Sequence, residues 1–209
     1  MKPFQLFAGG AFILMLVGLL GTIINEKAHF LLWLCDCRHP VLDYYFYYIT
    51  MLGEEYAFIF FGLLLWIMSW KRMITIPILG GVVMLVSYLS KLAFQHERPS
   101  LYLEKIGWEG PMTVMDYQVL SGYHSFPSGH SMAAWALFTL MAAHIKKTWF
   151  SILALFLATS VSISRVYLMV HFLQDVVAGA MIGFSLGYAV YYAYITWQKP
   201  SLSQTGSYL

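Results

Sequence analysis

Long apolar runs dominate this chain, and only a few polar segments separate them. A helix needs about 20 mostly apolar residues to cross a lipid bilayer. Six segments approach that length, near residues 5–24, 54–70, 73–94, 129–145, 148–166 and 168–197. The pattern therefore predicts an all-α membrane protein, in which six transmembrane helices form a bundle.

Two longer segments do not fit a spanning helix. His29 to Gly53 is rich in tyrosine, tryptophan and phenylalanine, which prefer the membrane–water interface, so we expect a short interfacial helix there. The longest polar stretch, Gln95 to Pro127, contains several glycines and prolines, which favour a loop between the third and fourth spans. Residues 199–209 include three serines, and we expect a disordered tail there.

The composition agrees with a membrane location. Of the 209 residues, 60% are hydrophobic and 11% are charged, whereas a soluble domain carries about 25% charged residues. The length suits a single domain covering residues 1–209, and the net charge of +2 argues against nucleic acid as a partner. Cys35 and Cys37 are poorly spaced for a disulfide, and we expect free thiols at the membrane boundary.

Three cations occur near predicted helix ends, where ionisable groups are costly unless they have a role. Lys91 lies near the end of the third span, Arg98 follows it in the loop, and Arg165 lies at the end of the fifth span. The alternating direction of the spans places all three at one face of the membrane. Arginine offers a planar set of donors suited to phosphate oxygens, and lysine offers a mobile point charge. Their convergence predicts a site for a multiply charged anion.

The start of the fourth span adds further anion-binding groups. Ser128 and Gly129 follow Pro127, in a pattern typical of a helix N-terminus. The free backbone N–H groups and the dipole of such a terminus attract anions, and glycine lets the backbone approach them closely. We therefore expect Ser128 and Gly129 to contact the same anion.

Histidines supply candidate reactive groups. His171 and Asp175 are four residues apart and are expected on one face of the sixth helix. A carboxylate so placed can accept a hydrogen bond from one imidazole nitrogen and leave the other as a nucleophile or base. His130 offers a second imidazole for acid–base catalysis at a leaving oxygen.

Each motif also has an ordinary explanation when it is taken alone. Lys91 is typical of a snorkelling lysine, and Pro-Ser-Gly is a common helix start. His171 and Asp175 can form a polar pair between helices. These explanations do not predict that all the motifs lie on one side of the membrane, and that shared location favours a functional site.

Together the motifs resemble the three-part signature of the type 2 phosphatidic acid phosphatase (PAP2) superfamily. The matching segments, within residues 91–175, are Lys91-x6-Arg98-Pro99, Pro127-Ser128-Gly129-His130 and Ser164-Arg165-x5-His171-x3-Asp175. The segment from His39 to Gly53 also resembles the family's approach to its second helix, so the resemblance covers about residues 39 to 190. The superfamily includes bacterial lipid phosphatases, undecaprenyl-diphosphate phosphatases, glucose-6-phosphatase and, more distantly, vanadium haloperoxidases.

The resemblance implies a role for each residue of the signature. His171 would attack phosphorus and form a phosphohistidine, with Asp175 orienting it. His130 would protonate the leaving oxygen and then activate water. The groups that would hold the phosphoryl oxygens are Lys91, Arg98, Ser128, Gly129 and Arg165. No metal and no cofactor are implied.

The expected reaction is therefore hydrolysis of a phosphate or diphosphate ester on a membrane lipid. Undecaprenyl diphosphate is the first expected substrate and phosphatidylglycerophosphate the second. A lipid A phosphate comes third, because no segment dedicated to sugar headgroups is visible. Two alternatives stay open: a lipid phosphotransferase that uses the same site, and a non-catalytic relative that binds or transports lipid phosphate. The intact pair of histidines favours catalysis.

The distribution of charge predicts the orientation in the membrane. With a cytoplasmic N-terminus, six lysines and arginines lie inside and six outside, but three of the latter are Lys91, Arg98 and Arg165. Without those three, the balance agrees with the excess of cations found on cytoplasmic sides, and all 10 carboxylate side chains fall outside. We expect both termini in the cytoplasm and the site on the extracytoplasmic face of the bacterial cytoplasmic membrane.

Several other polar residues lie beside the motifs. We expect His96, Glu97 and His124 to be solvent-exposed loop residues rather than substrate contacts. Glu54 and Glu55, at the start of the second span, could line the access path of a headgroup, although acidic residues are common at helix N-termini for electrostatic reasons.

Overall fold

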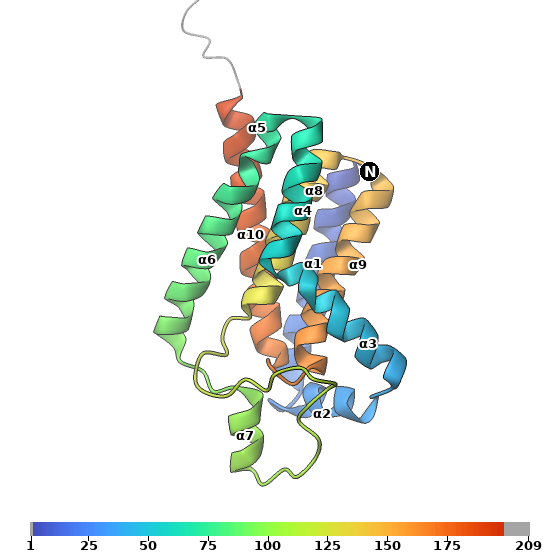
Figure 1. Ribbon diagram of the computed structural model, residues 1–209, viewed down its shortest axis with the longest axis vertical. Coiled ribbons are helices and arrows are strands. Elements are labelled where there is room, and N and C mark those ends of the chain that lie inside the picture. The colour runs from blue at the N-terminus through green and yellow to red at the C-terminus, as the bar shows by residue number, and fades with distance from the viewer. Residues whose placement is uncertain (1, 199–209) are drawn as a thin grey trace, which may run out of the picture.

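The computed structural model describes residues 2–198, and within that range the chain forms helices and loops without any strand (Figure 1). Helices occupy all the predicted membrane segments: α1 (Pro3–Ile24), α4 (Glu55–Met68), α6 (Thr75–Phe94), α8 (Gly129–Ile145), α9 (Thr148–Tyr167) and α10 (Leu173–Trp197). Shorter elements join them: α2 (His29–Asp36), α3 (Pro40–Ile49), the 3-10 helix η1 (Thr50–Gly53), α5 (Trp70–Met73) and α7 (Pro99–Lys105). The predicted tail, residues 199–209, lies outside the described residues.

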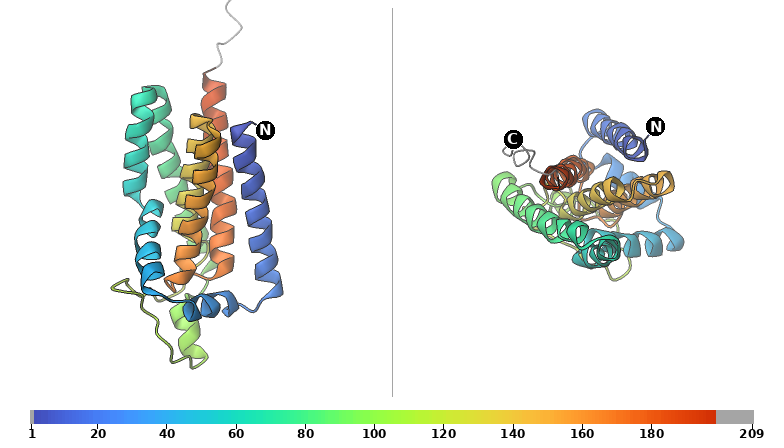
Figure 2. Two further views of the ribbon diagram at one scale, coloured as in Figure 1. Left: turned by 90° about the vertical axis from the view of Figure 1, so that its right-hand side faces the viewer. Right: turned by 90° about the horizontal axis from the view of Figure 1, so that it is seen from above.

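Helix α8 forms the core of the bundle. All its residues from Ser131 to His144 are buried, and it packs against α10, α9, α6 and α1. The surrounding helices run side by side along the long axis of the molecule (Figure 2). They expose large apolar side chains, such as Phe12, Ile67 and Met84. An apolar exterior of this kind suits contact with lipid rather than water.

A stripe of glycines allows α10 to lie very close to α8. A Cβ on Gly179, Gly183 or Gly187 would collide with a backbone carbonyl oxygen of α8 or of its N-cap residue. Small residues at such four-residue spacing let helix backbones approach in membranes. The close approach also brings together the first turns of α8 and α10, where Gly129, His130 and Asp175 lie.

Among residues 2–198, four segments are long and apolar enough to cross a membrane. They are α1, α9, α10 and the segment Trp70–Lys105, which contains α6. The pair Pro40–Gly53 and Glu55–Met68, bent by 62°, makes up to five. Helix α8 has only 17 residues, and those from Ser131 to His144 are buried inside the bundle. The all-helical membrane bundle is therefore confirmed, whereas the count of six crossings stays a prediction.

Some predicted boundaries are wrong. The aromatic segment forms two helices, α2 and α3, and the turn η1, not one short helix. The long polar stretch includes the helix α7. Helix α10 begins at Leu173, five residues later than expected, because the chain turns tightly from Leu168 to Phe172. Helices α2 and α7 and the long loop gather at one end of the bundle, opposite the start of α1 (Figure 1).

Candidate active site

The predicted site residues lie together at the end of the bundle that carries α7. Each comes from an element boundary: Lys91 from the last turn of α6, Arg98 from the residue before α7, Ser128 from the N-cap of α8, Gly129 and His130 from its first turn, Arg165 from the last turn of α9, His171 from the turn before α10, and Asp175 from the first turn of α10. The fold therefore brings together motifs that lie far apart in the sequence.

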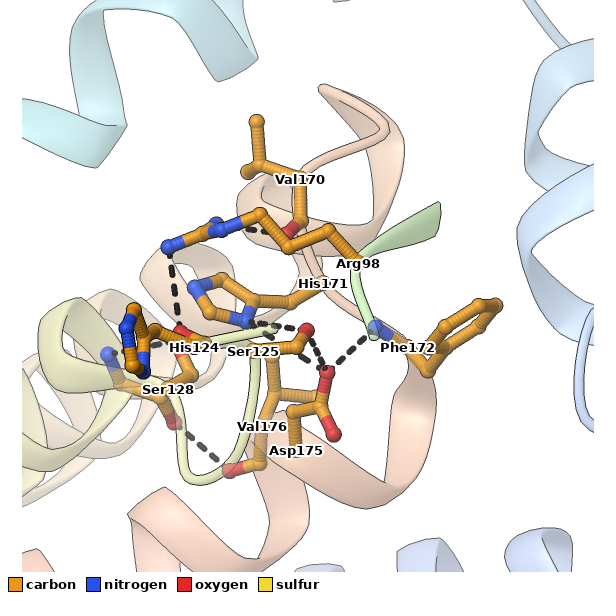
Figure 3. A network of polar contacts seen from close by, with 10 residues as sticks. Arg98, His124, Ser125, Ser128, Val170, His171, Phe172, Asp175 and Val176 are labelled. Atoms are coloured by element: carbon orange, nitrogen blue, oxygen red, sulfur yellow. Dashed lines mark hydrogen bonds and ion pairs between the residues drawn. The ribbon is translucent and has the colours of Figure 1, made fainter. Parts of the chain in front are cut away.

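His171, Ser125 and Asp175 form a buried polar cluster (Figure 3). Asp175 Oδ2 accepts hydrogen bonds from Ser125 Oγ at 2.6 Å and from the backbone N–H of Phe172 at 3.0 Å. His171 Nδ1 is 3.3 Å from Ser125 Oγ and 3.5 Å from Asp175 Oδ2. The side chains of His171 and Asp175 are 4% and 0% exposed.

The expected geometry of this pair is wrong in one respect. His171 does not share a helix face with Asp175, because it precedes the N-cap residue Phe172 of α10. Asp175 reaches back from the first turn of the helix, where it also satisfies the free N–H of Phe172. Ser125, which the sequence analysis did not single out, is the third member of the cluster.

The environment of His171 lowers its pKa to about 4. Burial is the main cause, because it disfavours the charged form, and the interaction with Asp175 offsets it only in part. His171 lies in the turn between α9 and α10, outside both helices. Its imidazole is therefore neutral at pH 7 and keeps a lone pair, as a nucleophile requires.

The first turns of α8 and α10 are held together by backbone contacts. The N–H of Ser128 donates to the carbonyl oxygen of Asp175 at 3.0 Å. Ser128 Oγ in turn accepts from the N–H of Ser131 at 3.4 Å, which caps α8. These bonds place the start of α8, with its uncompensated N–H groups, directly beside the His171 cluster.

Arg98 and Lys91 approach the same region from the third membrane segment. Arg98 donates from NH1 to Val170 O at 3.1 Å and from NH2 to His124 O at 3.2 Å, so two separate loops hold its guanidinium (Figure 3). Lys91 Nζ would be 3.7 Å from a Cβ on Gly129. Both cations therefore reach the neighbourhood of the first turn of α8.

Arg165 is almost fully buried, at 1% exposure. Its NH1 donates to Thr50 Oγ1 at 2.7 Å and to Tyr117 OH at 2.6 Å, and its guanidinium lies 5.4 Å from the centre of the Tyr117 ring. Sequence reasoning missed both partners. Thr50 lies in the segment that resembles the family, but nothing in the sequence around Tyr117 distinguishes it from other loop tyrosines.

His130 contacts a residue outside the predicted signature. Its Nε2 lies 3.4 Å from Glu54 Oε1, at the junction of η1 and α4. Glu54 had been expected only as a possible part of a headgroup access path. The structure places its carboxylate against the second histidine of the site.

Glu97, which we expected to be a solvent-exposed loop residue, is only 21% exposed. Its carboxylate pairs with Lys27 at 3.1 Å and with Lys105 at 2.6 Å. Lys27 Nζ also lies over the rings of Tyr102 and Phe172, 4.8 and 4.7 Å from their centres. This cluster ties the α1–α2 connection to the segments that carry Arg98 and His171.

A largely apolar groove of about 750 Å³ leads away from the site between α4 and α6. Glu54 and His130 lie at its site end, and Trp66 and Met73 lie near the far ends of the two helices. The groove could hold an apolar chain whose polar end reaches His130.

The described residues include no group of three or more histidine, cysteine, aspartate or glutamate side chains placed to hold a metal ion. The cations and helix N–H groups of the site suit an anion instead.

The structure is a bundle of membrane-length helices. Three cations, two imidazoles and a buried carboxylate lie at one end, which defines a membrane protein built around an anion site. The sequence profile of the PAP2 superfamily matches residues 72–199, more than half of the chain. The chain belongs to this superfamily, and the resemblance seen in the sequence is confirmed.

Three individual proteins illustrate the similarity. Lipid A 4'-phosphatase of Porphyromonas gingivalis is 31% identical over 189 residues, which cover 83% of this chain and 75% of the relative. The crystal structure of Aquifex aeolicus LpxE matches with a TM-score of 0.68 at 23% identity, over 80% of this chain and 95% of that one. The first transmembrane PAP2 type phosphatidylglycerolphosphate phosphatase from Bacillus subtilis matches with a TM-score of 0.65 at 24% identity, over 95% and 98%. At these identities the two structures support the fold alone.

Proposed function

We propose that this protein, as one domain, hydrolyses a phosphate or diphosphate ester of a membrane lipid through a phosphohistidine on His171. The observation that carries the proposal is the neutral, buried His171 beside Asp175, at a point where Lys91, Arg98 and the first turn of α8 converge. Membership of the PAP2 superfamily supports the same chemistry.

In the first step, the lone pair of His171 Nε2 attacks phosphorus. Nε2 is available because Nδ1 faces Ser125 and Asp175. A P–N bond forms as the bond from phosphorus to the lipid oxygen breaks, and the leaving oxygen takes a proton from His130. Preorganised donors stabilise the charge that develops on the phosphoryl oxygens: Lys91, Arg98, Arg165, Ser128 and the N–H of Gly129.

In the second step, His130, now neutral, takes a proton from water as the water oxygen attacks phosphorus. The P–N bond breaks, inorganic phosphate forms, and His171 is regenerated. A lipid hydroxyl in place of water would make the protein a phosphotransferase. Hydrolysis is the simpler proposal, because no second lipid site is needed for it.

The apolar groove supports a lipid substrate. Because the groove begins at His130 and runs between α4 and α6, a lipid could keep its chain in the groove while its phosphate reaches the site. Among lipid phosphates, the similarity to the Porphyromonas gingivalis lipid A 4'-phosphatase moves a lipid A phosphate from third to first candidate. Undecaprenyl diphosphate remains the alternative to test beside it.

We further propose six membrane crossings, with the site facing the extracytoplasmic side of a bacterial cytoplasmic membrane and both termini inside. The pairs Lys71-Arg72 and Lys146-Lys147 support this orientation, because α5 and the α8–α9 connection lie at the end of the bundle opposite the site (Figure 1). Cations are enriched in cytoplasmic connections.

The test is release of inorganic phosphate by the purified protein in detergent, with a panel of lipid phosphates and a metal chelator present. The panel includes lipid A, undecaprenyl diphosphate and phosphatidylglycerophosphate. We expect turnover of at least one lipid despite the chelator, with the wild type far above a His171→Ala control. Equal phosphate release by the wild type and the control would contradict the proposed function.

A further inference from the structure

The contact between Glu54 and His130 has no part in the reaction described above. Glu54 follows Gly53 at the break between η1 and α4, and its Oε1 lies 3.4 Å from His130 Nε2. Gly53 makes this approach possible, because a Cβ on it would lie 2.9 Å from both the Cβ and the carbonyl oxygen of His130. A larger residue at position 53 would therefore force η1 or the first turn of α8 to shift.

His130 is otherwise surrounded by positive charge. The charged or chargeable groups that act on its ring come from α6, the loop before α7, α9 and the turn before α10, and they are Lys91, Arg98, Arg165 and His171. The three cations among them, Lys91, Arg98 and Arg165, repel a protonated imidazole. The buried Asp175 is already paired with His171 and Ser125. In the part of the chain that the structure describes, Glu54 is the carboxylate in contact with His130.

We propose that Glu54 is a positioning residue that orients His130 and favours its imidazolium form against these cations, so that the ring can protonate the leaving oxygen. The proposal rests on the proposed function, in which His130 is the general acid. Glu54 accepts a hydrogen bond from Nε2–H of the imidazolium and leaves Nδ1–H to donate. As the P–O bond breaks, its electron pair goes to the leaving oxygen, and the Nδ1 proton passes to that oxygen. Glu54 stays ionised throughout, and His130 becomes neutral.

The position of Glu54 gives this role a distinctive kinetic signature. A carboxylate close to a phosphate site repels the anionic substrate, so removing its charge should not weaken binding. If Glu54 only shaped the site, its loss would affect all substrates alike. If it supports the general acid, its loss should lower kcat without raising KM, and most strongly for leaving groups that need a proton.

The test compares Glu54→Gln with Glu104→Gln, which removes an exposed carboxylate from α7 at the same end of the bundle. Rapid-quench measurements follow the first phosphoryl transfer from a lipid alkyl phosphate and from an activated aryl phosphate, whose leaving oxygen needs no proton. A general acid contributes roughly 100- to 10,000-fold, and we expect Glu54→Gln to lose part of this, about 10- to 100-fold, with the alkyl substrate. With the aryl phosphate the loss should stay below about threefold. Retained aryl phosphate turnover also shows that the variant is folded.

An equal loss with both substrates, or a rise in KM that accounts for the whole loss, would overturn the role of Glu54. His130→Ala, measured in parallel, separates this inference from the proposed function. If His130→Ala shows no dependence on the leaving group, the general-acid role of His130 fails, and the role of Glu54 fails with it. If His130→Ala shows the dependence and Glu54→Gln does not, Glu54 alone is wrongly assigned. The double variant should be no slower than His130→Ala, and additive losses would contradict the proposal.

Discussion

Removal of the Ser125 hydroxyl should slow the formation of the phosphohistidine without weakening substrate binding. Ser125 Oγ donates to Asp175 Oδ2 at 2.6 Å inside a buried cluster and lies 3.3 Å from His171 Nδ1. In Ser125→Ala, the buried carboxylate keeps the N–H of Phe172 as a donor but loses its shortest hydrogen bond. The ring of His171 then loses one of the two groups that fix its orientation.

The size of the effect follows from the chemistry of that bond. A hydrogen bond to a charged group contributes about 1.5–3 kcal/mol, and each 1.36 kcal/mol corresponds to a tenfold change in rate. If the whole loss appears in the transition state, the first phosphoryl transfer slows roughly 10- to 150-fold. Part of the loss can appear instead as a lower free energy of unfolding, because Asp175 is buried.

The assay therefore measures two quantities, the rate of the first phosphoryl transfer and the thermal unfolding midpoint in detergent. Ser121→Ala, a change at an exposed serine of the same loop, is the matched control and should alter neither. A Ser125→Ala protein with wild-type rate and wild-type stability would refute the reasoning, because the bond would then contribute nothing.

Three further predictions concern the surroundings of this cluster. Tyr117→Phe removes one of the two acceptors of Arg165 Nη1, and we expect kcat/KM, measured by steady-state kinetics, to fall about tenfold, the effect of one hydrogen bond to a charged group. An unchanged kcat/KM would show that Thr50 alone fixes the guanidinium. Because burial lowers the pKa of His171 to about 4, its lone pair is lost only as the pH falls through that value. The rate of phosphohistidine formation should therefore stay constant from pH 7 down to about 5, and a fall in the rate near pH 6.5 would contradict this. Ser121→Cys, in a protein without Cys35 and Cys37, should react with a membrane-impermeant thiol reagent in intact cells. If this cysteine reacts only after lysis, while control cysteines on the other face react in intact cells, the proposed orientation is reversed.

The membrane helices and the signature residues could be predicted because both depend on local sequence. Apolar runs of sufficient length specify buried or lipid-facing helices wherever the rest of the chain lies, and helices occupy all the predicted segments. The positions of Arg98 and Ser128 at element boundaries follow from Pro99, Pro127 and Gly129 in the neighbouring sequence. The glycine spacing at Gly179, Gly183 and Gly187 was equally visible in the sequence and could have predicted the close contact of α10.

The contacts that refine the site could not be predicted in this way. Ser125, Tyr117 and Glu54 reach the catalytic candidates only through the tertiary arrangement of η1, the long loop and α10. The late start of α10 has the same origin, since the residues before it turn tightly and pack in the core, although their apolar character is compatible with a helix. Hydrophobicity alone does not distinguish a buried turn from a buried helical turn.

The most direct test of the account is to trap the covalent intermediate. The protein is mixed with a substrate labelled in its phosphoryl group, quenched in alkali, which preserves phosphohistidine, and digested for mass spectrometry. We predict label on the peptide that contains His171 and none in His171→Ala. With an activated aryl phosphate, whose leaving oxygen needs no proton, we predict more label in His130→Ala, where hydrolysis of the intermediate lacks its base. Label on another residue, or undiminished phosphate release by a folded His171→Ala protein, would contradict the central claim that His171 is the nucleophile.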